Sequence, residues 1–149
     1  MLNRTFSKLK KQTIGYWVTT ALVGFAFAAG GLGDLLGSPE VMGAMAHLGY
    51  PAYVASILGV WKMLGAAAIV APGMPRVKEW AYAGMFFDLT GAAISHAVLG
   101  DGVSAVLTPL VLSAVVAASW ALRPASRKLE SHAPPLAQHR LSAELHPTA

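Results

Sequence analysis

The sequence lacks cysteine altogether, and only 12% of its 149 residues are charged. Without cysteine, disulfides, thiolate metal sites, CxxC redox chemistry and cysteine nucleophiles are all excluded. The sequence also has no GxxxxGK[ST] phosphate loop, GxSxG nucleophile elbow, HExxH zinc motif or CxxCH haem motif. The usual short signatures of nucleotide-binding, hydrolytic and haem proteins are therefore missing.

Apolar residues are abundant instead. Hydrophobic residues make up 55% of the chain, and the mean hydropathy is +0.54. A soluble domain of this length would not have enough polar residues to cover its surface. The net charge is +4, but the basic residues flank apolar runs and do not form a face interleaved with aromatic rings, so no nucleic-acid partner is expected. The lipid bilayer is the expected environment.

Four runs are long enough to cross a hydrocarbon core about 30 Å thick, which takes roughly 20 helical residues. Each run ends at a cluster of glycine or proline, and none alternates like a barrel strand. The predicted fold is an all-α, integral membrane four-helix bundle in residues 14–123. A basic cytoplasmic segment (residues 1–13) precedes it and a disordered cytoplasmic tail (residues 124–149) follows it. The predicted spans are about 14–36, 53–71, 79–99 and 103–122.

The positions of Lys and Arg predict the orientation, because cytoplasmic loops retain these residues. Of the 11 Lys and Arg, only Lys62 lies inside a predicted span; all others precede the first span, follow the fourth or lie between the second and third. Both termini are therefore expected in the cytoplasm, in a multi-pass protein of a bacterial inner membrane. A cleaved signal peptide ending at Ala26-Phe27-Ala28 is the alternative, but the apolar run continues well past that site.

Two charged residues lie near the middle of predicted spans. Lys62 in the second span and Asp88 in the third reach similar depth if the two helices are antiparallel neighbours, so we expect a direct or water-bridged pair. Small residues share a face with each of them, and such faces let helix backbones approach closely. The pair is either an internal strut that fixes helix register or a group that handles protons or contacts a ligand.

A second set of polar residues lies toward the outer side. Asp34 and His96 are each roughly 12 Å above the midplane at 1.5 Å per residue, and His47 in the outer loop is a third candidate. Asp and His suit proton transfer near neutral pH, so these three residues define a candidate outer pocket with aromatic walls such as Phe27 and Trp61. Ordinary interfacial hydrogen bonding is the alternative, and we assign no metal site.

Four runs carry a resemblance to a known family. They are HLGYPAY (residues 47–53), ILGVWKMLGA (57–66), KEWAYAGMFFDLTGAAISH (78–96) and ALRPASR (121–127). In sequence and spacing these runs resemble the DoxX-like family of bacterial membrane proteins, and the resemblance covers about residues 14–128. The resemblance implies a four-helix membrane domain related to small membrane subunits of thiosulfate:quinone oxidoreductase from sulfur-oxidising archaea. It carries no known catalytic residue onto this chain.

Three functions follow as hypotheses. The leading one is a binding or accessory protein that holds a small hydrophobic ligand, with a quinone as candidate, or docks a membrane or redox partner. The second is a membrane-embedded oxidoreductase or isomerase subunit that moves protons through Asp34, His96 or the pair of Lys62 and Asp88. The third is a structural assembly factor for another membrane protein.

Overall fold

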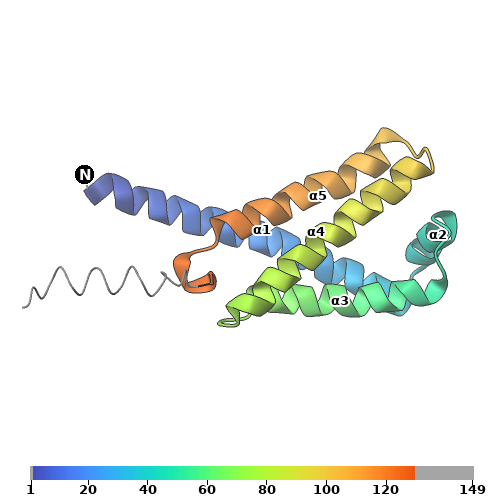
Figure 1. The fold of residues 1–149 in the computed structure, drawn as a ribbon, viewed down its shortest axis with the longest axis horizontal. Helices are drawn as coiled ribbons and strands as arrows, with labels where there is room; N and C mark the ends of the chain where they lie inside the picture. The colour runs from blue at the N-terminus through green and yellow to red at the C-terminus, as the bar shows by residue number, and fades with distance from the viewer. Residues whose placement is uncertain (1, 130–149) are drawn as a thin grey trace, which may run out of the picture.

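The computed structural model describes the backbone of residues 2–129 and the side chains from residue 9 onward. This part of the chain contains five α-helices, one short 3-10 helix and no strand (Figure 1). In chain order the elements are α1 (Leu2–Leu36), α2 (Pro39–His47), α3 (Ala52–Val70), α4 (Pro75–Val98), α5 (Val103–Leu122) and the 3-10 helix η1 (Ala125–Arg127).

The long helices run alternately in opposite directions. α1 and α4 each pack against both α3 and α5, while α2 packs against α3. The N-terminal part of α1, the turn between α3 and α4, and η1 gather at one end of the molecule (Figure 1). At the other end lie α2 and the turn between α4 and α5. We call these the inner end and the outer end.

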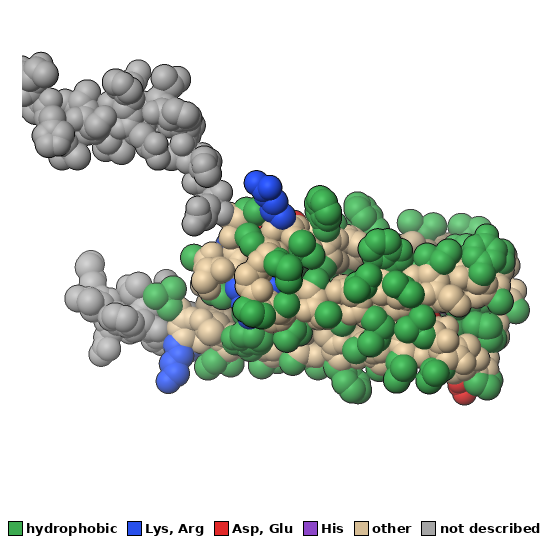
Figure 2. All heavy atoms as spheres, turned by 90° about the horizontal axis from the view of Figure 1, so that it is seen from below, with side chains coloured by type: hydrophobic (Ala, Val, Ile, Leu, Met, Phe, Trp, Pro, Cys, Tyr) green, Lys and Arg blue, Asp and Glu red, His purple; other side chains and the backbone are tan. Residues whose placement is uncertain are grey.

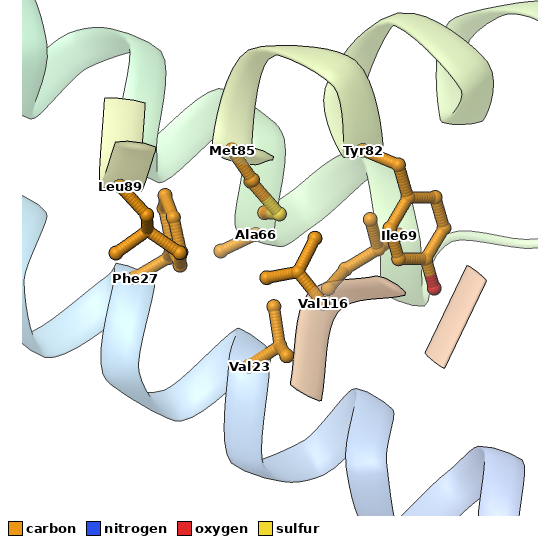
Figure 3. Packing of buried hydrophobic residues seen from close by; sticks show 8 residues of the cluster. All are labelled: Val23, Phe27, Ala66, Ile69, Tyr82, Met85, Leu89 and Val116. Carbon is orange, nitrogen blue, oxygen red and sulfur yellow. The ribbon is translucent and has the colours of Figure 1, made fainter. Parts of the chain in front are cut away.

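A compact apolar core joins the four long helices. Val23 and Phe27 of α1 meet residues of α3, α4 and α5 in one contiguous cluster (Figure 3). Met85 and Leu89 of α4 point into this cluster, and Val116 of α5 is 1% exposed. The core therefore sits in the inner half to the middle of the molecule, where it fixes the relative positions of α3 and α4.

Apolar side chains also cover the outside. Figure 2 shows hydrophobic groups along the whole of one lateral face, with Lys and Arg gathered near one end. By length and composition, three helical segments of the described residues suit a membrane span: Leu9–Leu36, Ala52–Val70 and Val103–Leu122. The chain is therefore an all-helical membrane protein. α4 is not among the three, and its sequence contains the charged residues Arg76, Lys78, Glu79 and Asp88.

The structure differs from the expected boundaries at four places. α1 begins at Leu2, so its helix extends well before residue 14. α4 begins at Pro75, four residues before the expected start at residue 79, because proline is tolerated in the first turn of a helix. α2 forms where only a loop was expected: Ser38 accepts a hydrogen bond from the amide of Val41, and Pro39 occupies the first helical turn. Residues 125–127 of the predicted tail form η1, and residues 130–149 lie outside the described part of the chain.

Candidate functional site

A groove lies between α3 and α4 and has a volume of about 400 Å³. Phe27 and Met85, which belong to the core (Figure 3), also line this groove. Trp61 and Trp80 line it too, and their side chains are 67% and 78% exposed. The other lining residues are Leu58, Lys62, Leu64, Gly65, Ala68, Val77, Ala81, Gly84 and Asp88. Lys62 and Asp88 are thus the only charged groups in an otherwise apolar and aromatic lining.

Lys62 contacts two carboxylates. Its Nζ donates a hydrogen bond of 2.8 Å to Asp34 Oδ2 and lies 3.9 Å from Asp88 Oδ2. The Asp34 side chain is 5% exposed, whereas Lys62 and Asp88 are each 21% exposed. Asp34 is therefore the buried, hydrogen-bonded partner, and Asp88 is the more loosely held carboxyl that faces the groove. We call these three residues the charged triad.

Two glycines bring α1 and α3 together beside the triad. A Cβ at Gly59 would lie 2.9 Å from Gly31 O, and a Cβ at Gly31 would lie 3.0 Å from Lys62 Cβ. A side chain at Gly59 would therefore force its neighbours to move, and one at Gly31 would be tightly packed. The close approach places the stem of Lys62 directly over α1, within reach of Asp34.

The outer end holds a different cluster. Asp101, in the turn before α5, receives His47 Nε2 at 2.8 Å and His96 Nδ1 at 2.6 Å. Hydrogen bonds from His96 and His47 lower the pKa of the Asp101 carboxyl. Nearby, the Tyr50 and Ser95 hydroxyls are 2.9 Å apart. This cluster ties α2 to the turn between α4 and α5.

The inner end is held by cations that bind the last carbonyls of α3. Lys78 Nζ donates to the carbonyls of Ala68 and Ala71. Arg127 donates to the carbonyls of Ile69 at 3.1 Å and Val70 at 3.2 Å. Positive groups at a helix C-terminus complement its dipole and satisfy its free carbonyls. Lys78 and Arg127 therefore stabilise the C-terminus of α3.

A second ionic contact joins α4 to the end of α5. Arg123, with a side chain 2% exposed, donates to Glu79 Oε1 at 2.7 Å, and Trp120 Nε1 donates to Glu79 Oε2 at 2.7 Å. The Arg123 guanidinium also lies 5.1 Å from the centroid of the Tyr82 ring. A neighbouring groove of about 480 Å³ between α4 and α5 ends at Glu79. Its one charged group is already bonded, so it offers less for ligand recognition than the groove between α3 and α4.

The predicted site residues are thus divided between two places. Lys62 and Asp88 lie together in the groove, and Asp34 lies with them through its bond to Lys62. His47 and His96 meet at Asp101 instead, and neither they nor Asp34 line the groove. Among the described residues, no group of three or more His, Cys, Asp or Glu is placed to hold a metal ion.

Sequence reasoning did not single out Asp101, Arg123 or Arg127 as interacting residues. Asp101 stands in a Gly-Asp-Gly sequence, which by itself predicts only the end of a helix. The sequence pattern marks the two arginines only as topological signals, although Arg123 directly follows the apolar helix α5 and Arg127 is the last residue of η1. The signal that would have found them is the position of a cation at a helix terminus beside buried aromatic residues.

The fold and groove define a helical membrane protein with a charged triad beside an apolar lateral groove. The family model described as the DoxX-like family matches residues 18–119, which is more than two thirds of the chain. This chain belongs to the DoxX-like family. No curated protein and no solved structure matches it significantly.

Proposed function

We propose that this protein binds a small hydrophobic molecule in the groove between α3 and α4, with a quinone as the leading candidate. The observation that carries the proposal is the lining of the groove, in which Trp61 and Trp80 flank an apolar volume next to the charged pair Lys62 and Asp88. Ligand sites commonly combine an apolar wall with a few polar groups that fix orientation. The volume of about 400 Å³ lies within the range of about 300 to 1,000 Å³ usual for small-molecule sites.

The proposed setting is a bacterial inner membrane crossed by α1, α3, α4 and α5, with both termini in the cytoplasm. Support for the fourth span comes from α4, whose 24 residues lie antiparallel to α3 and α5. At about 1.5 Å per residue a helix of this length spans a hydrocarbon core about 30 Å thick. A C-terminal alkaline phosphatase fusion tests the orientation: an inactive fusion is expected, and an active one contradicts it.

The ligand proposal is tested by filling the groove. A Cβ at Gly84 meets no atom within 4 Å, so Gly84→Leu extends a side chain into the groove without a clash at the backbone. Gly91 lies two turns further along α4 and has the same open space, but it does not line the groove. Gly91→Leu is therefore the matched control.

The measurement is mass spectrometry of the quinones and other lipids retained by gently purified protein in nanodiscs. We expect Gly84→Leu to retain at least about tenfold less of the bound molecule than the unchanged protein, since the groove no longer accepts it. Gly91→Leu should retain as much as the unchanged protein. Equal retention by both variants, with unchanged melting temperatures, would show that the groove is not the binding site.

A further inference from the structure

The charged triad contains one more acid than base. If all three groups were ionised, two carboxylates and one ammonium would leave a formal charge of −1 between apolar helices. An uncompensated charge in such surroundings costs several kcal/mol. Two carboxylates that share one site avoid this cost when one of them keeps its proton.

The contacts indicate which carboxyl keeps the proton. Asp34 is 5% exposed and accepts the hydrogen bond of 2.8 Å from Lys62, so Asp34 and Lys62 form the direct ion pair of the triad. Asp88 lies 3.9 Å from Lys62 Nζ, beyond hydrogen-bond distance. No hydrogen bond between described side chains involves Asp88. We therefore assign the proton to Asp88, which makes the formal charge of the triad zero.

We infer that Asp88 is a neutral carboxylic acid that donates a hydrogen bond to a carbonyl oxygen of the hydrophobic ligand. This inference rests on the proposed function and names the chemistry that selects the ligand. Asp88 lines the groove, and its side chain is 21% exposed, so its hydroxyl reaches a bound molecule. A cationic head group is disfavoured, because the ammonium of Lys62 lines the same groove and would repel it.

Two substitutions separate a neutral acid from a carboxylate. Asp88→Asn keeps a neutral group with a hydrogen-bond donor, whereas Asp88→Leu keeps the shape and removes the donor. Asp101→Asn is the control, since it makes the same chemical change in the outer turn. Each protein is reconstituted in nanodiscs, and its melting temperature is recorded first.

The probes are menadione and 2-methylnaphthalene, which share a fused ring and a methyl group but differ in the two carbonyls. Equilibrium dialysis against nanodiscs that contain each protein gives both dissociation constants. Empty nanodiscs serve to subtract partitioning into lipid. The quantity compared is the ratio of the two constants, which isolates the contribution of the carbonyls.

We expect the unchanged protein, Asp88→Asn and Asp101→Asn to prefer menadione to a similar degree, within about threefold. Asp88→Leu should lose about tenfold of that preference, as expected for the loss of one buried hydrogen bond. A drop in Asp88→Asn as large as that in Asp88→Leu would show that the group acts as a carboxylate and would overturn the inference. A preference unchanged in Asp88→Leu would overturn it too.

The two probes also distinguish a failure of this inference from a failure of the proposed ligand-binding function. Suppose that the unchanged protein binds both probes with equal affinity and Gly84→Leu binds neither. The groove then binds hydrophobic molecules without recognising their carbonyl groups, and only the inference about Asp88 fails. If the unchanged protein binds neither probe beyond the empty nanodisc, the ligand proposal fails together with the inference.

Discussion

The charged triad predicts unequal coupling between Lys62 and its two acidic neighbours. Lys62 donates a hydrogen bond of 2.8 Å to Asp34 but lies 3.9 Å from Asp88. A hydrogen bond between charged groups contributes about 1.5 to 3 kcal/mol, whereas a partly solvated pair without one contributes about 0 to 1 kcal/mol. We therefore expect a coupling free energy of about 2 kcal/mol between Lys62 and Asp34, and less than about 1 kcal/mol between Lys62 and Asp88.

Two double-mutant cycles measure these values. One combines Lys62→Met with Asp34→Leu, and the other combines Lys62→Met with Asp88→Leu; each substitution removes the polar group and roughly keeps the shape of the side chain. Lys62→Met alone should lower the free energy of unfolding by about 3 kcal/mol, because it leaves the buried Asp34 carboxylate without its partner. Adding Asp34→Leu should recover much of that loss.

The assay is reversible unfolding of the protein in mixed micelles of dodecyl maltoside and SDS, followed by circular dichroism. Val98→Leu serves as a control for a substitution on α4, since Val98 is 80% exposed and lies ten residues beyond Asp88. A coupling between Lys62 and Asp88 equal to or larger than that between Lys62 and Asp34 would refute the assignment of the primary ion pair. It would also contradict a neutral Asp88.

Three further predictions concern the rest of the fold. Gly59→Ala should lower the melting temperature through overpacking of about 1 to 3 kcal/mol, since its Cβ would lie 2.8 Å from the next helix, whereas Gly30→Ala, with open space around it, should not. Arg127→Gln should speed hydrogen exchange at the inner end of α3, because it removes donors to carbonyls there. The depressed pKa of Asp101 means that its stabilising contribution is complete above the ordinary carboxyl pKa of about 4 and is lost as pH falls through the lower folded value. The loss of melting temperature at acid pH should therefore be smaller in Asp101→Asn than in the unchanged protein.

The helix boundaries show what the sequence could predict. Glycine and proline punctuation placed the ends of α3 and α5 within about a residue, because a run of apolar residues ends where the backbone can no longer continue a helix. α2 has only nine residues, too few to cross a membrane, so the length of apolar runs does not predict it. The signals of Ser38, Pro39 and Glu40 were present, but they mark any helix start, long or short.

The partner of Lys62 could not be predicted from depth. Asp34 was placed near the outer end of its span and Lys62 near the middle of its own, about a turn or more apart. The contact of Gly31 with Gly59 sets the register of α1 against α3. The lengths of the two predicted spans do not determine this register. In an α-helix the side chain leans toward the N-terminus, which for α3 is the outer end. The long stem of Lys62 therefore reaches outward to Asp34.

The charged residues of α4 are explained by their contacts with neighbouring helices. α4 is the one long helix of the described residues that is not among the three segments apolar enough to span a membrane by composition, and it contains the charged residues Lys78, Glu79 and Asp88. Lys78 binds carbonyls of α3, Glu79 binds Arg123, and Asp88 lies beside Lys62. A helix can carry charged groups among its neighbours where those groups meet partners there, since the cost of a charge in lipid applies to the unpaired group. In the proposed topology, α4 is thus able to cross the membrane only as part of the assembled fold, and its least satisfied group, Asp88, is the one that faces the groove.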